Sequence, residues 1–254
     1  MKKEISAVIV CGMTQSGSTL LYNMIREFYE FNNFNVLCMI AGKPTYITDG
    51  YNSTNIKNPI IQLTKQHDAT SENNLENMVF INTRRDVRDC IASLSKKNPS
   101  YLGGDLVKMA DENMGYFESA KTFSDYQWNY EDYKRDPIEE TKKIFKFLSK
   151  FTYKSIAEGV THENKKLNPK YVYDANVAKI VHMCENIKNL NIPDSEEEDI
   201  INSHNLYKKT LMSKKHITSN NGKIGAYKET FTEKQINLIE KECGPWLIEN
   251  GYMK

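Results

Sequence analysis

The chain has 254 residues, and its 34 lysines and arginines nearly balance its 33 aspartates and glutamates, which gives a formal net charge of +1 at pH 7. Its 39% hydrophobic and 11% aromatic residues exclude a disordered chain, which would have few aromatic residues and a large net charge. The balanced charge also argues against a nucleic-acid-binding protein, because such proteins are usually strongly basic. The length suits one large domain, and we predict a single domain over residues 1–254.

The cysteines and the apolar segments bear on the cell compartment. The five cysteines are widely spaced and form no Cys-x-x-Cys pair, so neither a disulfide framework nor a zinc site is indicated. The apolar run at 5–11 is short for a signal peptide, and no cleavage pattern follows it. No run of about 18 apolar residues, the length that spans a membrane, is present. We therefore expect a cytoplasmic protein.

Short apolar runs alternate with helical patterns along the chain. Residues 7–11 form a continuous apolar run ending at Gly12, which is typical of a strand buried on both faces of a parallel sheet. Residues 18–29 follow with apolar side chains at helical spacing. Further strands are predicted at 36–40, 60–63, 78–81 and 127–130, and further helices at 87–95, 105–123, 138–151 and 235–242. This alternation predicts an α/β fold with a central parallel sheet flanked by helices.

The turn between the first strand and the first helix has the spacing of a phosphate-binding loop. Four residues separate Gly12 from Gly17, and Ser18 and Thr19 open the helix. Backbone N–H groups and the helix dipole make this context an anion site. Ser18, however, stands where a Walker A loop has the lysine that reaches the β- and γ-phosphates of ATP, which disfavours a P-loop kinase. A purely structural glycine turn is the alternative for this segment taken alone.

Residues 14–21 resemble the 5′-phosphosulfate loop of the sulfotransferases that use 3′-phosphoadenosine 5′-phosphosulfate (PAPS). That donor has no γ-phosphate to hold, which accounts for the missing lysine. The resemblance implies a P-loop-like sulfotransferase fold with no metal requirement. It also implies that the donor is bound by Gln15, Ser16, Gly17, Ser18 and Thr19.

A second motif follows the predicted strand at 78–81. Arg85 and Ser93 are eight residues apart and resemble the pair that binds the 3′-phosphate of the donor in the same family. A guanidinium forms charge-assisted hydrogen bonds to a phosphate, and a hydroxyl on the following helix adds a donor. Because Asp86 and Asp89 lie between them, a salt-bridged helix start is the alternative for these residues alone.

Two further segments resemble nucleotide-binding parts of the family. Residues 222–232 are similar to the C-terminal segment that closes over the nucleotide, which implies donor contacts for Gly222 and Lys223. Tyr130 begins a Tyr-Glu-Asp segment like the one whose tyrosine lies near the adenine. For Tyr130 alone, an aromatic core residue is the alternative.

Lys65 and His67 lie between the two phosphate motifs and resemble the family's Lys-Thr-His segment. The resemblance implies that His67 deprotonates the acceptor and that Lys65 lies near the sulfuryl group. Histidine is the natural base near neutral pH. A lone histidine in a polar loop is otherwise more often merely exposed.

Two departures from the family pattern bear on activity. Gln15 takes the place of a basic residue that assists the departing phosphate, and a neutral amide donates a hydrogen bond without neutralising charge. Such a loss costs on the order of a hundredfold in rate in a preorganised site. Asn220 and Asn221 stand where the family usually has an Arg-Lys pair.

The sequence therefore predicts a single-domain sulfotransferase that moves a sulfuryl group from PAPS, its co-substrate, to a hydroxyl or amine acceptor by in-line transfer with a histidine base. The acceptor class stays open among small molecules, sugars and lipid head groups, and the oligomeric state is not predicted. One alternative is a catalytically impaired relative that binds PAPS or the product bisphosphate, PAP. A P-loop small-molecule kinase is the other.

Overall fold

The computed structural model describes residues 3–40, 43–47, 59–68, 77–156, 165–166, 174–190, 209–212 and 222–254. A six-stranded sheet with the order β4-β3-β5-β2-β6-β7 lies at their centre. Its strands are β2 (Ala7–Gly12), β3 (Asn35–Ile40), β4 (Lys43–Ile47), β5 (Ile60–Lys65), β6 (Met78–Arg84) and β7 (Tyr126–Asn129). Neighbouring strands are parallel except β4, which is antiparallel to β3. The predicted α/β fold with a central parallel sheet is therefore confirmed.

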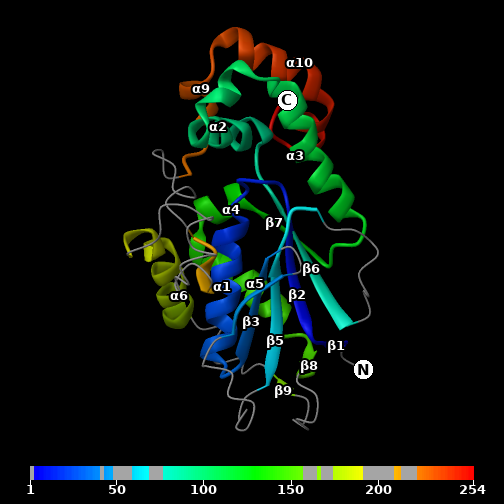
Figure 1. Ribbon diagram of the computed structural model, residues 1–254, viewed down its shortest axis with the longest axis vertical. Helices are drawn as coiled ribbons and strands as arrows, with labels where there is room; N and C mark the ends of the chain where they lie inside the picture. Colours follow the sequence, from blue (N-terminus) through cyan, green and yellow to red (C-terminus); the bar gives the residue numbers. More distant parts are fainter. Residues whose placement is uncertain are drawn as a thin grey trace.

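Helices cover both faces of this sheet (Figure 1). On one face α1 (Ser18–Phe31) contacts β2, β3 and β5, and on the other α3 (Leu106–Lys121) contacts β2 and β6. The other described helices are α2 (Val87–Lys97), α4 (Tyr130–Arg135), α5 (Pro137–Leu148), α6 (Asp174–Asn186), α9 (Tyr227–Thr230) and α10 (Glu233–Glu249), with 3-10 turns at Pro99–Gly103 and Ile187–Asn189. Helices α5 and α6 pack beside α1, whereas α2 and α10 pack beside α3.

Strand β2 is buried on both faces, as its continuous apolar run predicts. Because side chains alternate along a strand, they enter two different cores. Val8 and Val10 join the cluster that contains α1, whereas Ile9 and Cys11 join the cluster on the side of α3. β2 lies between β5 and β6, so the carboxyl ends of three parallel strands are adjacent. Ligands of open α/β sheets bind at such an edge.

The structure contains several elements that the sequence did not predict. Strand β4 adds an antiparallel edge, and β1 (Glu4–Ile5), β8 (Thr152–Tyr153) and β9 (Lys165–Lys166) form a small second sheet. Helix α6 lies in a stretch where no element was predicted. Tyr130 begins α4 instead of ending a strand, because the side chain of Asn129 accepts hydrogen bonds from the first N–H groups of that helix.

The last helix, α10, is longer than the predicted segment 235–242. Thr232 caps it through a capping box with Gln235. The helix continues through Pro245 because Cys243 and Leu247 are buried in the core cluster that α10 shares with α2 and α3. This burial outweighs the hydrogen bond that proline cannot donate. Among the described helices, none is long and apolar enough to cross a membrane.

Gly12, at the end of β2, leaves no room for a side chain. An ideal Cβ atom there would lie 2.4 Å from both Oδ1 of Asn82 and the carbonyl oxygen of Thr83, and its φ is 107°. We expect Gly12→Ala to lower the free energy of unfolding by about 3 kcal/mol or more, measured by urea denaturation. Gly115→Ala in α3 is the matched control, because nothing lies within 4 Å of its added Cβ. It should stabilise the protein by up to about 1 kcal/mol, and equal effects of the two substitutions would contradict this account.

Candidate functional site

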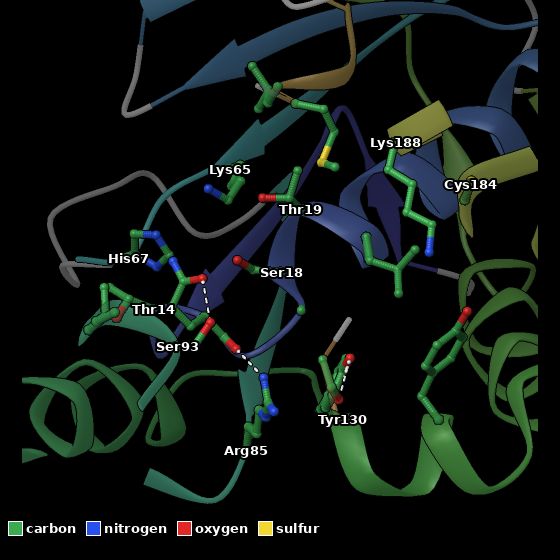
Figure 2. A pocket seen from close by; sticks show the side chains of 18 of the residues that line it. Thr14, Ser18, Thr19, Lys65, His67, Arg85, Ser93, Tyr130, Cys184 and Lys188 are labelled. Carbon is green, nitrogen blue, oxygen red and sulfur yellow. Dashed lines mark hydrogen bonds between the residues drawn. The ribbon is translucent and has the colours of Figure 1, made fainter. Parts of the chain in front are cut away.

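A cavity of about 580 Å³ lies where β2 and β5 end and α1 and α4 begin (Figure 2). This volume is typical of small-molecule sites. Most of the predicted site residues line it, namely Gln15, Gly17, Ser18, Thr19, Lys65, His67, Arg85, Ser93, Tyr130 and Gly222. The other two, Ser16 and Lys223, do not. The fold thus brings to one place segments that are far apart in the sequence.

The loop between β2 and α1 lies against Tyr130. Its backbone is left-handed at Gln15, with φ 58°, and at Gly17, with φ 83°. A Cβ atom on Gly17 would lie 2.6 Å from Cδ2 of Tyr130, so only glycine fits there. The loop leads into the first turn of α1, whose free N–H groups and dipole favour an anion in the cavity.

Ser16 points away from the cavity and fixes the loop to the sheet. Its hydroxyl donates to the carbonyl oxygen of Met13 at 2.6 Å and lies 2.7 Å from Oγ1 of Thr83. Thr83 in turn donates to the carbonyl oxygen of Cys11 at 2.9 Å. The side chain of Ser16 is fully buried in this network. The hydrogen bonds of Ser16 therefore stabilise the conformation of the loop, in which the neighbouring residues line the cavity.

Arg85 and Ser93 both contact Gln15 (Figure 2). Nη1 of Arg85 donates to the carbonyl oxygen of Gln15 at 3.2 Å, and the hydroxyl of Ser93 donates to its Oε1 at 3.3 Å. The guanidinium carbon of Arg85 lies 4.6 Å from the ring centroid of Tyr130. Nε of Arg85 is buried with no hydrogen-bond partner among the described residues. A positive charge and a hydroxyl therefore lie close together at the cavity wall, as suits a phosphate group.

Asp89 ties the C-terminal segment to α2, a role that the sequence analysis did not assign. Its carboxylate accepts hydrogen bonds from the N–H groups of Gly225 at 2.8 Å and Tyr227 at 3.1 Å. It also lies 3.6 Å from Nη2 of Arg85, which donates to the carbonyl oxygen of Lys223 at 3.0 Å. Gly225 is 136 residues from Asp89 along the chain, so no local pattern signals this contact.

Gly222 contacts Tyr130, whereas the side chain of Lys223 faces solvent. The hydroxyl of Tyr130 donates to the carbonyl oxygen of Gly222 at 3.1 Å. A Cβ atom on Gly222 would lie 1.9 Å from that hydroxyl, so a larger residue would displace the ring. Lys223 is exposed and forms an ion pair with Glu229. Its ammonium group therefore lies outside the cavity wall.

His67 and Lys65 occupy one side of the cavity (Figure 2). Nδ1 of His67 lies 3.0 Å from the carbonyl oxygen of Gly12. Because a carbonyl only accepts, Nδ1 must carry the proton, which leaves Nε2 of the neutral ring as the basic atom. The pKa of His67 is lowered to about 4, chiefly by burial; the positive charges of Lys65 and Lys97 add to the lowering, and the hydrogen bond to Gly12 opposes it. The ring is therefore neutral at pH 7.

A four-residue segment at 209–212, here called the strap, forms a wall that the sequence did not reveal. Its Leu211 lines the cavity and has a φ of 53°, which is unusual for a residue with a side chain. Asn23 of α1 holds the strap in place. Its Nδ2 donates to the carbonyl oxygens of Thr19 and Thr210, each at 2.8 Å. The helix that begins at the loop therefore also positions the strap.

The cavity is rich in positive charge. Among the described residues, the cations that line it are Lys65, Arg85, Lys97, Lys134 and Lys188. Among the described residues that line the cavity, Glu185 is the single acid, and it accepts a hydrogen bond from the hydroxyl of Tyr133 at 2.9 Å. Glu185 and Lys188 were not predicted as site residues, because their region of the sequence gives no clear helical pattern. This excess of positive charge favours a ligand with several negative charges.

Known proteins resemble this chain in structure but not in sequence. No family profile matches the chain, and no curated protein matches it by sequence. Its structure is similar to that of the mouse sulfotransferase SULT7A1, solved in complex with PAP, with a TM-score of 0.58 and 13% identity over 95% of this chain and 84% of that one. The chain has a sulfotransferase fold.

A second solved structure of this fold supports the assignment. Retinol dehydratase, in a complex with retinol and PAP, matches with a TM-score of 0.51 and 16% identity over 96% of this chain and 82% of that one. The fold that the loop at 14–21 implied is therefore confirmed. The roles of individual site residues stay predictions. Among the described residues, no group of three or more His, Cys, Asp or Glu side chains is placed to hold a metal ion.

The strap of this sulfotransferase fold should depend on Asn23. Asn23→Ala removes a hydrogen bond to the carbonyl of the buried residue Thr210. We expect backbone hydrogen exchange at 209–212 to rise about tenfold or more, measured by mass spectrometry. Asn32→Ala is the control, because Asn32 is also buried in this region but donates within its own helix, to Phe28. It should cost about 1 to 2 kcal/mol of stability and leave exchange at the strap unchanged, so equal effects would contradict the role of Asn23.

Proposed function

We propose that this protein is a sulfotransferase that moves a sulfuryl group from PAPS to a hydroxyl or amine acceptor. The observation that carries the proposal is the meeting of three motifs in one cavity: the loop before α1, the pair Arg85 and Ser93, and the pair Lys65 and His67. Any one of them alone has a structural explanation. Two proteins of the same fold that were solved with PAP add support.

The residues of the cavity fit the donor. PAPS carries negative charge at both ends of its ribose, and the cavity wall is strongly cationic. In the proposed complex, the loop and the first turn of α1 hold the 5′-phosphosulfate, while Arg85 and Ser93 hold the 3′-phosphate. Tyr130 would lie beside the adenine, between Gly17 and Gly222. Ser16 and Lys223 contribute through backbone atoms, because their side chains are directed elsewhere.

The proposed reaction moves one proton and one sulfuryl group. Nε2 of His67 accepts the proton of the acceptor as the acceptor oxygen or nitrogen bonds to sulfur, and the bond from sulfur to the phosphate oxygen of the donor breaks. Lys65, which is 7% exposed, stabilises the charge on the sulfuryl oxygens. The negative charge that develops on the leaving bisphosphate lies on the loop, where Gln15 offers an amide in place of a cation.

A nucleotide-binding protein with little or no turnover is the second candidate, favoured by Gln15. Its Oε1 accepts from Ser93, so this side chain links the two phosphate sites without adding charge. The other departure, Asn220 and Asn221, lies outside the described residues. Turnover of labelled PAPS with an acceptor panel separates the candidates. A near-inactive wild type together with a large gain in Gln15→Lys would favour the second.

Affinity for the bisphosphate product tests the donor site. We expect calorimetric titration to show binding of PAP in preference to Mg-ATP, and Arg85→Met to weaken it about 10- to 100-fold through loss of a charge-assisted contact. Arg84→Met is the matched control, because the neighbouring arginine donates to Asn250 and does not line the cavity. Since Arg85 also supports the fold, Ser93→Ala serves as a milder second variant. Tight binding of Mg-ATP with no response to PAP would overturn the proposal.

The pH dependence of turnover tests the base. His67→Ala should lower kcat/KM about 10²- to 10⁴-fold, whereas His182→Ala, on the exposed side of α6, should leave it unchanged. The pKa of His67 is lowered to about 4, so the free ring is neutral and able to accept a proton above that pH. The contribution of His67 to kcat/KM should therefore stay level from about pH 8 to pH 5.5 and fall only as the pH approaches 4. A fall centred near pH 6.5 would contradict this assignment.

A further inference from the structure

The end of the cavity around His67 carries a second lysine that the donor contacts do not use. Lys97 lies in the last turn of α2 and lines the cavity together with Ser93, one helical turn earlier on the same face. In the proposed complex the 3′-phosphate lies at Arg85 and Ser93, and Lys65 faces the sulfuryl group. Lys97 therefore lies one turn beyond the proposed phosphate contact in the same cavity and acts on the ring of His67, which the acceptor of the proposed reaction must reach.

Within the described part of the chain, the charges that act on His67 are predominantly positive. Lys65 at the end of β5 and Lys97 on α2 both act on the ring. From α3, Tyr116 presents a neutral ring whose centroid lies 6.1 Å from that of His67. Asp68 follows in the chain, but it is exposed and does not line the cavity. When His67 accepts a proton, the new positive charge is repelled by those of Lys65 and Lys97, which opposes the transfer.

We propose that the acceptor is an anionic hydroxyl or amine compound and that Lys97 binds its negative group. This inference rests on the proposed function, because it assigns the acceptor of that same site. A carboxylate or phosphate on the acceptor forms a charge-assisted hydrogen bond with the ammonium of Lys97. The same negative charge favours the protonated form of His67 as the acceptor loses its proton. The anionic group is not consumed, so the bonds made and broken are those of the sulfuryl transfer itself.

Phenols that differ only in charge test the inference. The panel is 4-hydroxybenzoate, 4-hydroxyphenylacetate and 3-(4-hydroxyphenyl)propionate, each with its neutral methyl ester, so that three spacings are sampled. Binding to the PAP-loaded protein is measured by calorimetry, and kcat/KM is measured with PAPS. We expect at least one carboxylate to bind about tenfold more tightly than its ester, as suits one charge-assisted contact.

Variants at Lys97 test whether this residue causes the preference for the carboxylate. Lys97→Met should remove the preference for the carboxylate, and Lys97→Glu should reverse it in favour of tyramine, the cationic analogue. Lys96→Met is the matched control, because this neighbouring lysine in the same turn does not line the cavity. It should retain the preference. Affinity for PAP alone should change less than twofold in Lys97→Met.

The outcomes separate this inference from the proposal on which it rests. Failure of the wild type to bind PAP would overturn the sulfotransferase function itself. If PAP binds but each ester binds as tightly as its carboxylate, the assignment of an anionic acceptor is wrong. A loss of tenfold or more in PAP affinity on Lys97→Met would also overturn it, because Lys97 would then belong to the donor site.

Discussion

A buried ion pair between Arg85 and Asp89 joins three segments of the chain that lie far apart in the sequence. Removing two charges from water is costly unless their remaining hydrogen-bonding groups are satisfied. Here the carbonyl groups of Gln15 and Lys223 accept hydrogen bonds from Nη1 and Nη2 of the guanidinium, and the carboxylate accepts from the N–H groups of Gly225 and Tyr227. The loop before α1, the start of α2 and the C-terminal segment are thereby fixed relative to one another. The shape of the cavity depends on this pair.

Arg85 also has a hydrogen-bond donor that its structural contacts leave unused. Its Nε has no partner among the described residues, although the atom is buried. A buried donor without an acceptor is unfavourable, and in the proposed complex the 3′-phosphate would remove that cost. In that proposal, Arg85 links the stability of the site to the binding of the donor. The same guanidinium would then stabilise the fold and bind the donor.

The sequence predicted the central elements because each has a strong local signal. Residues 7–11 form an uninterrupted apolar run, and α10 begins at a capping box. Helix α6 and the strap give weak signals, because they owe their positions to contacts such as that of Asn23 with Thr210. The same distinction between local signals and long-range contacts applies to the site. The resemblance of the motifs to those of sulfotransferases implied most of the residues that line the cavity. It did not indicate that the side chain of Ser16 turns away from the cavity into the core or that the side chain of Lys223 faces solvent, because both directions depend on partners elsewhere in the fold.

Tyr130 stands between two glycines, Gly17 of the loop and Gly222 of the C-terminal segment, and a Cβ atom on either would collide with its ring or hydroxyl. One aromatic ring thus acts as a spacer that sets how closely two backbone segments approach. The width of the cavity at this point is a property of that ring, and not of the glycines themselves. A change in the size of this single side chain would therefore alter the opening between the two segments without any change in either of them.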